Sequence, residues 1–420
     1  FSDEYAQMLL ERHKVVGHSM WGGTLISSLL GNELPGPGTV YQTQTLEFHG
    51  AVELDDTLTI TVTVTEKDPQ DGSVCFDCRV VNQRQEKIIT GEAKVKAPTR
   101  KPTDAGSPYT TMEIRPTNAF KMLIERVRDL EPIPTAVCHP CSKEALQGPI
   151  DAARTDLIDP ILVGPQEKIR SLADELKLDI SSYRLIDSQH SHDSAAKAVA
   201  LCRQGEAEAL MKASLHTDEI MREVTRRETG LRTEMRISHV FAFDVPTYPR
   251  PLFITDAAIN IYPDLEDKVD ILKNAIQLAH ALGKPQPKVA ILSAVETIYP
   301  KIPATIEAAA LCKMADRGQI EGAIIDGPLA FDNAISKEAA LIKGIDSPVA
   351  GEADIFLVPD LEAGNMLAKQ LSYLAEADSA GLVMGARVPI ILTSRADSAE
   401  ARLASCAVAV AYAHWQRQNN

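Results

Sequence analysis

The stretch DGPLAFDNAISKEAALIKGIDSPVAGEADIFLVPDLEAGNMLAKQLSYLAEADSAGLVMGARVPIILTSRADS, residues 326–398, contains short apolar runs that each stop at small, polar or cationic residues. The runs at 355–358 and 389–393 are typical of buried strands in an open parallel sheet, whose strand ends carry functional groups. Ser394 and Arg395 follow the second run directly. A hydroxyl beside a planar guanidinium at the end of a buried strand predicts a site for an anion.

Helical and strand-like segments alternate on both sides of this stretch. We expect a helix over residues 118–130, a strand at TAVCH (135–139) and another strand at PILVG (160–164). Such alternation is typical of an α/β region with mainly parallel strands. The segment VPTYPRP, residues 245–251, breaks the periodicity, so we expect two lobes with a site in the cleft between them.

Residues 1–97 follow a different pattern, in which polar and apolar residues alternate as in an antiparallel sheet. The apolar segment HSMWGGTLISSLLG, residues 18–31, predicts one buried helix that ends at Gly31. Several prolines in residues 98–116 predict a linker. We therefore expect a small α+β domain in which one helix faces a curled sheet. Its three expected strands are TLTITVTVTE (57–66), SVCFDCRVVNQ (73–83) and KIITGEAKVKA (87–97).

Composition and charge argue against several classes of function. The formal charge of −15 argues against a nucleic-acid partner. No apolar run approaches the roughly 20 residues of a membrane helix, so we expect no membrane partner. The chain opens without a basic and apolar leader, and its seven cysteines lack a repeating framework. Both features favour a cytoplasmic protein in a reducing compartment.

Two pairs of cysteines have CxxC spacing. Cys75 and Cys78 fall in an expected strand, where residues three apart point to opposite faces and do not easily share a metal. Cys138 and Cys141 follow a strand-like run, which leaves a redox or zinc site as an alternative. No second pair with ligand spacing accompanies them. We expect structural cysteines and no metal.

The run VVGHSMWGGTLISSLLGNELPGPGTVYQTQTLEFHGAVELDDTLTITVTV, residues 15–64, resembles the MaoC-like, hotdog-fold enoyl-CoA hydratases. The resemblance implies that backbone amides at the start of the central helix hold a thioester carbonyl, which suits the positive end of a helix dipole. His18, Ser19 and Met20 occupy that position. Ser19 stands where the family usually has glycine, and a side chain there could crowd the backbone approach.

The hydratases use an aspartate and a histidine that would precede the segment beginning at Phe1. We therefore expect residues 1–97 to be an N-terminally incomplete hotdog domain without hydratase activity in this chain, because hydration requires a carboxylate and an imidazole to manage the proton. A non-catalytic module that binds acyl-CoA or drives oligomerisation is the alternative. Asp3, Glu4 and His13 are interpreted as surface charge.

Residues 117–420 resemble the phosphate acetyl- and butyryltransferases, and the order of the two regions resembles bifunctional enoyl-CoA hydratase/phosphate acetyltransferase proteins. The resemblance implies an α/β fold of two lobes similar to isocitrate dehydrogenase, with lobe I at about 117–250 plus 390–420 and lobe II at about 251–389. The segments that carry it are ITDAAINIYPDLEDKVDI (254–271), PKVAILSAVE (287–296), DGPLAFDNA (326–334), SPVAGEADIFLVPDLEAGN (347–365) and ILTSRADS (391–398).

The reaction implied by this resemblance converts acyl-CoA (acetyl-CoA or butyryl-CoA) and inorganic phosphate into acyl phosphate and CoA, with CoA as substrate and no bound cofactor. Such a site needs cations for phosphate, donors for an oxyanion and help with the thiol proton. Arg395 would hold phosphate or the oxyanion, and Ser394 would contact the thiol. A structural ion pair of Arg395 is the alternative. The resemblance also implies a homodimer or higher homo-oligomer.

An aspartate seven residues after the serine is thought to take the thiol proton in the acetyl-type relatives, but this chain has Ala401 there. The butyryl-type relatives also read SRADS. We therefore expect Asp397 to act as base or thiol orienter, since a thiol of pKa about 8.5 needs only modest help. The alternative is that Asp397 or Ser398 caps the final helix.

Further substrate-binding residues are expected from the same resemblance. In ALMKASLHTDEIMREVT (209–225), Arg222 is a candidate CoA ligand, and AAKAVALCRQG (195–205) offers Arg203; exposed helix charges are the alternative for both. Lys212, His216 and Thr217 fall at an expected strand-to-helix turn. Backbone amides and the helix dipole at such a turn favour phosphate binding, and a purely structural turn is the alternative.

Carboxylates at strand ends suggest either a metal or helix caps and arginine partners. Asp326, Asp332, Asp256 and Asp264 are of this kind, and only Asp326 is expected to lie in the cleft. An NAD(P)-dependent decarboxylating dehydrogenase is the alternative enzyme, because such enzymes share the implied fold. No GxGxxG follows a strand, and no cluster of metal-binding aspartates is evident.

Overall fold

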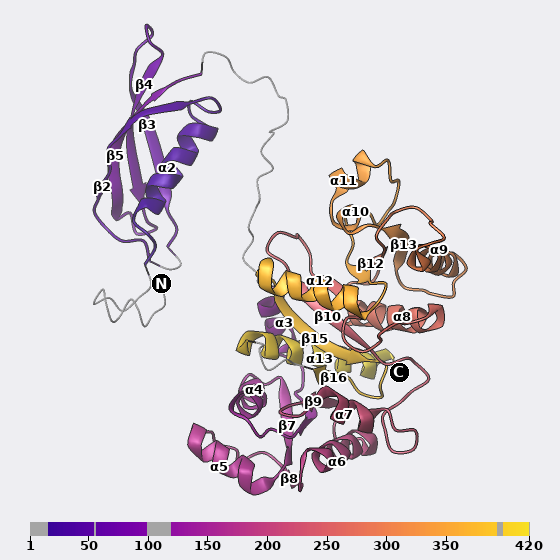
Figure 1. Cartoon of the computed structure of the whole chain (residues 1–420). Coiled ribbons are helices and arrows are strands. Elements are labelled where there is room, and N and C mark those ends of the chain that lie inside the picture. Colours follow the sequence, from indigo (N-terminus) through magenta and orange to yellow (C-terminus); the bar gives the residue numbers. More distant parts are fainter. Residues whose placement is uncertain (1–15, 54–55, 99–118, 393–397, 420) are drawn as a thin grey trace. The chain divides into compact units, whose positions relative to one another are not determined.

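A computed structural model describes residues 16–53, 56–98, 119–392 and 398–419. The chain divides into two compact units, Phe1–Thr111 and Met112–Asn420, which are described separately below (Figure 1).

The first unit is a helix packed on an antiparallel sheet. The strand order is β1-β5-β4-β3, and β2 pairs with β5. Antiparallel ladders join all neighbouring strands, as the alternating sequence predicts. The elements are α2 (Met20–Asn32), β1 (Val40–Gln44), β2 (Glu47–Phe48), β3 (Thr59–Lys67), β4 (Ser73–Val81) and β5 (Lys87–Lys96).

Helix α2 buries one face against this sheet. Ile26 and Leu30, four residues apart on that face, are fully buried in an apolar core with strand residues such as Phe76 and Ile89. The helix was expected to end at Gly31, but it continues to Asn32. Its last turn closes by a hydrogen bond from the backbone N–H of Glu33 to the Leu29 carbonyl (3.0 Å). The short strands β1 and β2 were not predicted.

The second unit is built on one sheet of eleven described strands. Neighbouring strands run parallel except around β10, where the β11–β10, β10–β15 and β15–β16 pairs are antiparallel. The strands follow the order β13-β12-β14-β11-β10-β15-β16-β9-β6-β7-β8. Their bounds are β6 (Ile133–Cys138), β7 (Ile158–Gly164), β8 (Leu185–Asp187), β9 (Ala209–Lys212), β10 (Ser238–Asp244), β11 (Leu252–Thr255), β12 (Lys288–Leu292), β13 (Ile324–Leu329), β14 (Ile355–Leu357), β15 (Asp378–Met384) and β16 (Ile390–Leu392).

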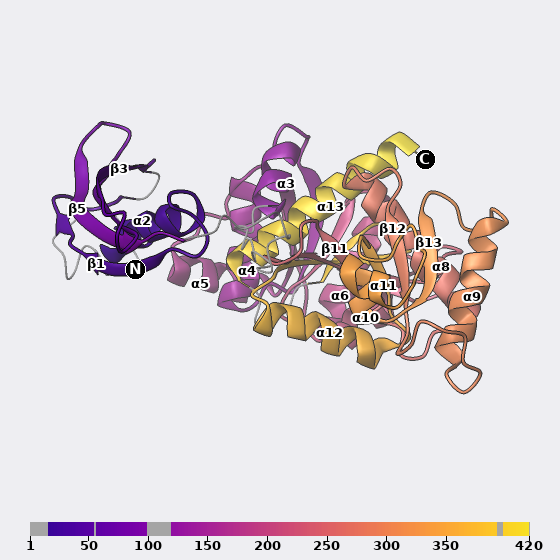
Figure 2. The same ribbon diagram turned by 90° about the horizontal axis from the view of Figure 1, so that it is seen from above.

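Helices cover both faces of this sheet, and Figure 2 shows α12 and α13 on opposite sides of it. The helices are α3 (Ala119–Val127), α4 (Lys143–Arg154), α5 (Gln166–Leu176), α6 (Ser191–Gln204), α7 (Thr217–Val224), α8 (Leu265–Ala281), α9 (Pro303–Asp316), α10 (Phe331–Ile335), α11 (Lys337–Ile342), α12 (Leu361–Leu374) and α13 (Ala399–Asn419). None of the helices described here is long and apolar enough to cross a membrane.

The two faces of the sheet are packed differently. On one face a single apolar core runs under α3, α4, α5, α8, α9 and α13. On the other face the core is divided into one cluster under α6 and α7 and another under α10, α11 and α12. Strand β10 crosses the division: Val240 and Ala242 point into the continuous core, whereas His239 and Phe241 point to the divided face. This interruption positions the site.

The α/β pattern and the mainly parallel strands agree with the expectation from sequence. The helix expected over residues 118–130 is α3, and the two expected strands are β6 and β7. Near the expected break at VPTYPRP (245–251), the chain turns back from β10 into its antiparallel neighbour β11.

Candidate active site

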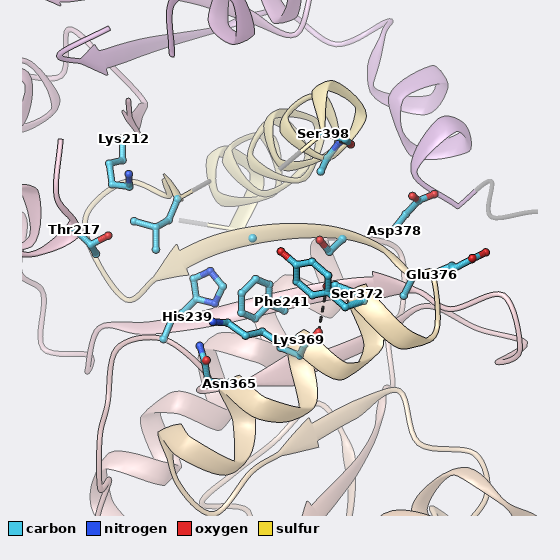
Figure 3. Close-up of a pocket in the computed structure, with 18 of the residues that line it drawn as sticks. Lys212, Thr217, His239, Phe241, Asn365, Lys369, Ser372, Glu376, Asp378 and Ser398 are labelled. Carbon is cyan, nitrogen blue, oxygen red and sulfur yellow. Dashed lines mark hydrogen bonds between the residues drawn. The ribbon is translucent and has the colours of Figure 1, made fainter. Parts of the chain in front are cut away.

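A cavity of about 790 Å³ lies on the divided face of the second unit. Strands β9, β10, β15 and β16, the turn before α7, and helices α12 and α13 contribute to its wall, as Figure 3 shows for the labelled residues. It is therefore bounded by elements from both apolar clusters of that face. The polar and charged side chains that line it are Lys212, His216, Thr217, His239, Asn365, Lys369, Ser372, Tyr373, Glu376, Asp378, Ser379 and Ser398.

The carboxyl ends of two parallel strands meet at this cavity. Strand β16 pairs with β9 so that Leu392 lies opposite Lys212, and both residues line the cavity. Because parallel strands present their carboxyl ends at the same edge, Leu392 lies beside the start of the turn that follows Lys212.

Ser394, Arg395 and Asp397 lie outside the described residues. The described residues that flank their segment are Leu392 and Ser398, and both line the cavity. The two points at which this segment joins the described structure are therefore in the wall of the same cavity.

The turn between β9 and α7 contributes three of the expected residues. The Lys212 side chain is only 8% exposed, and its Nζ donates to the carbonyls of Ala213 (3.3 Å) and Leu215 (3.2 Å). His216 is the N-cap residue of α7, and Thr217 is its first residue. All three expected residues (Lys212, His216 and Thr217) line the cavity at a strand-to-helix turn, as the sequence predicts.

The central strand β10 contributes His239, which the sequence reasoning missed. His239 is fully buried, and its ring meets that of Phe241 edge-on, with centroids 4.3 Å apart. Burial lowers the pKa of His239 to about 3, so the imidazole is neutral at neutral pH. A lone histidine in the apolar strand SHVFAFD was the available signal.

Three other expected residues lie away from this cavity. Arg222 is exposed in the last turn of α7 and is not among the lining residues. Arg203, at the end of α6, donates from Nη1 to the Gly230 carbonyl (3.2 Å), which is a structural contact. Asp326 lies in the edge strand β13, and its Oδ1 accepts from the Gly327 N–H (2.9 Å). Asp326 does not line the described cavity, because β13 is at the far edge of the sheet, and its place in a substrate cleft stays a prediction.

Ser398 caps the final helix. Its Oγ accepts a hydrogen bond from the backbone N–H of Ala401 (3.1 Å), three residues later, as an N-cap side chain does. Ala401 itself lines the cavity, at the position where the acetyl-type pattern has aspartate.

Carboxylates considered as metal ligands have structural roles. Asp256 accepts hydrogen bonds from the backbone N–H groups of Ala258, Ile259 and Asn260, and burial raises its pKa. Asp264 is the N-cap of α8 in a capping box with Asp267. Within the described ranges, no group of three or more His, Cys, Asp or Glu side chains is arranged to hold a metal ion.

A second cavity of about 300 Å³ shares Lys212 with the first. Lys168 and Arg402 add two more cationic side chains to its lining, and Ser142 at the start of α4 also contributes. Three cations against one carboxylate, that of Glu144, line this small cavity, and this balance favours an anionic ligand.

In the first unit, His18, Ser19 and Met20 lie at the start of α2 and are exposed. The Nδ1 atom of His18 accepts a hydrogen bond from the backbone N–H of Met20 (3.2 Å). Ser19 makes no side-chain cap hydrogen bond.

Comparisons with known proteins identify the class to which the second unit belongs. Residues 188–410 match the family model described as "Phosphate acetyl/butaryl transferase". A phosphate acetyltransferase of Rhizobium meliloti is 63% identical over 298 residues, which cover 71% of this chain and 94% of that protein. A phosphate butyryltransferase of Clostridium acetobutylicum is 42% identical over 291 residues, which cover 69% of this chain and 97% of that protein.

A solved structure agrees with these matches. The crystal structure of a branched-chain phosphotransacylase from Enterococcus faecalis V583 superposes with a TM-score of 0.60 and 29% identity, and covers 67% of this chain and 99% of that one. The second unit is thus an acyltransferase. The chain belongs to the phosphate acetyl/butyryl transferase family, and the alternative of a decarboxylating dehydrogenase is set aside.

Proposed function

We propose that the second unit transfers an acyl group, acetyl or butyryl, between CoA and inorganic phosphate. The observation that carries the proposal is the pairing of Leu392 with Lys212 at the wall of the 790 Å³ cavity. In the sequence, Ser394 and Arg395 follow the cavity residue Leu392 by two and three positions. The names of the relatives, phosphate acetyltransferase and phosphate butyryltransferase, supply the substrate class.

The proposed reaction needs three kinds of group. In the direction of thioester synthesis, a base takes the thiol proton, the sulfur bonds to the carbonyl carbon of acyl phosphate, and the carbon–oxygen bond to phosphate then breaks. In the reverse direction a phosphate oxygen attacks the thioester carbonyl and CoA leaves as thiolate, which regains the proton. Cations must hold the phosphate, and hydrogen-bond donors must stabilise the tetrahedral oxyanion.

We assign these tasks to residues at and beside the cavity. Arg395 holds the phosphoryl group, because a guanidinium offers a planar pair of donors to its oxygens. Ser394 contacts the thiol, and Asp397 receives or orients its proton. Lys212 and the turn that starts α7 add positive potential, which supports binding of phosphate at that end of the cavity.

The small cavity that shares Lys212 is proposed to receive phosphate groups of CoA. Its support is the charge of Lys168, Lys212 and Arg402 in the lining, in a chain whose formal net charge is −15. A phosphate-bearing ligand of an acidic protein depends on such local cations.

The direct test is phosphate-dependent release of CoA, followed with a thiol reagent. Acetyl-CoA and butyryl-CoA are supplied with and without inorganic phosphate. The proposal predicts release only when phosphate is present, with acyl phosphate as the second product. Release of CoA at the same rate without phosphate would indicate a thioesterase instead.

For the first unit we propose a MaoC-like hotdog domain that binds acyl-CoA at the start of α2. The support is the sequence resemblance, together with one helix packed on an antiparallel sheet and the exposed His18, Ser19 and Met20 at the helix N-terminus. A non-catalytic module for oligomerisation remains the alternative role. If the first unit is such a domain, the two domains follow each other along the chain in the same order as in the bifunctional hydratase/transferase proteins.

Calorimetric titration of the full chain with crotonyl-CoA tests this assignment. Ser19→Asp puts a negative charge where the thioester oxygen would bind, and should abolish one binding event while leaving the transferase unit's own binding intact. Ser28→Asp, an exposed change on the same helix but away from its start, is the matched control. Identical isotherms for the two variants would rule out the α2 site.

The finer organisation is also a proposal. We propose a linker at residues 98–116, two lobes in the manner of isocitrate dehydrogenase with boundaries near 250 and 390, and a homo-oligomer. A cytoplasmic location is supported by the seven cysteines, which are all free in the structure. Two of their thiols, those of Cys202 and Cys406, are unreactive, because burial raises the pKa of each to about 12.

A further inference from the structure

His239 combines two properties that rarely occur together. Its side chain is 0% exposed, yet neither Nδ1 nor Nε2 has a hydrogen-bond partner among the described residues. A buried polar group without a partner costs free energy, and most such groups in folded proteins are paired. The second observation is that His239 lines the 790 Å³ cavity. A ligand in that cavity could supply the missing partner.

The surroundings of the ring fix its chemical form. Phe241 lies edge-on to the ring, and Gly381 on the neighbouring strand β15 leaves space beside it. A Cβ atom at Gly381 would lie 2.9 Å from Nε2 of His239. Because burial keeps the imidazole neutral, it has one N–H donor and one acceptor nitrogen.

The cavity lining contains both apolar and cationic groups. Phe241, Ala368 and Leu392 suit an acyl chain, whereas Lys212 and Lys369 suit a phosphate. Figure 3 shows the end of the Lys369 side chain beside the His239 ring. A neutral N–H donor with a cation beside it is suited to a carbonyl oxygen, which is uncharged in the substrate and gains negative charge when the carbonyl carbon is attacked.

We propose that His239 is a catalytic residue whose ring N–H donates a hydrogen bond to the carbonyl oxygen of the acyl group. This inference rests on the proposed acyl transfer. The bond strengthens as the tetrahedral oxyanion forms, and no proton leaves the imidazole. The imidazole is not assigned the thiol proton, because an imidazole that resists protonation is a weak base toward a thiol.

Two substitutions in the full chain separate this role from a packing role. His239→Leu removes both nitrogens and fills a similar space, and His239→Gln keeps an N–H donor. Phosphate-dependent CoA release should show kcat reduced about 100-fold in His239→Leu, as for a lost oxyanion donor. The unfolding temperature should be unchanged or higher, because an unpaired buried polar group is removed. His239→Gln should recover part of the lost kcat.

Ser293→Ala is the matched control. Ser293 is another buried side chain whose Oγ has no partner among the described residues, but it does not line the cavity. Its replacement should leave kcat unchanged. The control shows whether removal of any buried unpaired polar group alters turnover.

The possible outcomes discriminate clearly. Wild-type kcat in a folded His239→Leu protein would overturn the inference, and so would equal losses in folded His239→Leu and His239→Gln. If His239→Leu does not fold, His239→Gln decides: a folded protein with substantial activity supports the donor role, and a folded inactive one contradicts it. Failure of the wild-type protein to release CoA with phosphate would instead reject the proposed function itself.

Discussion

Leu392 lies opposite Lys212 in the parallel ladder between β16 and β9. The two residues end their strands at the same edge of the sheet, and both line the same cavity. Ser398, which caps α13, also lines this cavity. The described residues on either side of the segment that contains Ser394 and Arg395 therefore line one cavity.

The roles of Asp397 and Ser398 are separable by substitution. Ser398→Ala removes the cap on the Ala401 N–H and should destabilise the second unit by about 1 kcal/mol. Its turnover should change little once the protein is folded. Asp397→Asn should lower kcat with almost no change in unfolding temperature, because it removes the carboxylate without removing the cap. A reversed pattern, with Asp397→Asn mainly destabilising, would assign the cap to Asp397.

Filling the space beside His239 is expected to lower the turnover rate. Gly381→Ala adds a Cβ atom that would lie 2.9 Å from His239 Nε2 and 3.2 Å from the Leu392 carbonyl oxygen. The imidazole must shift, and a displacement near 1 Å can reduce turnover by roughly 100-fold. Gly31→Ala, where no atom lies within 4 Å of the added Cβ, is the control. Steady-state kinetics with full activity in Gly381→Ala would show that the position of the ring is unimportant.

His239 also predicts how stability depends on pH. Its pKa in the folded protein is about 3, whereas a histidine in the unfolded chain has a pKa of about 6.5. At pH values between these two, the His239 imidazole binds a proton only in the unfolded state. The contribution of neutral, buried His239 to the free energy of unfolding is therefore fully present above about pH 6.5 and is lost as the pH falls. Between pH 7 and pH 5 the wild-type protein should lose about 2 kcal/mol more stability than His239→Leu.

Urea unfolding at the two pH values measures this difference. The chain has two tryptophans, Trp21 in the first unit and Trp415 in α13, so a Trp21→Phe background makes fluorescence report on the second unit alone. Other histidines titrate equally in both proteins and cancel in the comparison. Equal losses of stability in the two proteins would mean that His239 is protonated as readily in the folded state as in the unfolded one.

Much of this arrangement could be predicted from sequence because strand ends are marked locally. Polar residues directly after an apolar run pointed to Ser394 and Arg395, whereas the turn at Lys212 and His216 was expected from the family resemblance. Asp326 was expected in the cleft, but it lies within the edge strand β13 and does not line the described cavity. Strand order is set by packing between distant segments, and one sequence does not reveal it.

His239 was missed for a related reason. The sequence SHVFAFD indicates a strand, but not that alternate residues of that strand face a gap between the core under α6 and α7 and the core under α10–α12. That gap exists because helices from two parts of the chain cover neighbouring areas of one sheet face. Likewise, the contact of Arg203 with the Gly230 carbonyl depends on a loop 27 residues away along the chain.

The central claim is that Arg395 holds the phosphoryl group during acyl transfer. The matched control residue is Arg387, an exposed arginine in the turn between β15 and β16. Arg395→Lys keeps the charge but not the planar pair of donors, so it should recover only part of the activity lost in Arg395→Ala. Arg387→Ala should retain the wild-type rate.

The most direct test is the rate of phosphate-dependent CoA release from acetyl-CoA and butyryl-CoA by the wild-type chain and by Arg395→Ala. The wild-type chain should release CoA only with phosphate, and Arg395→Ala should lose about 2 to 4 kcal/mol of transition-state stabilisation, as lost oxyanion donors do. Release that ignores phosphate, or near-normal turnover in a folded Arg395→Ala protein, would contradict an acyl transfer to phosphate carried by this segment.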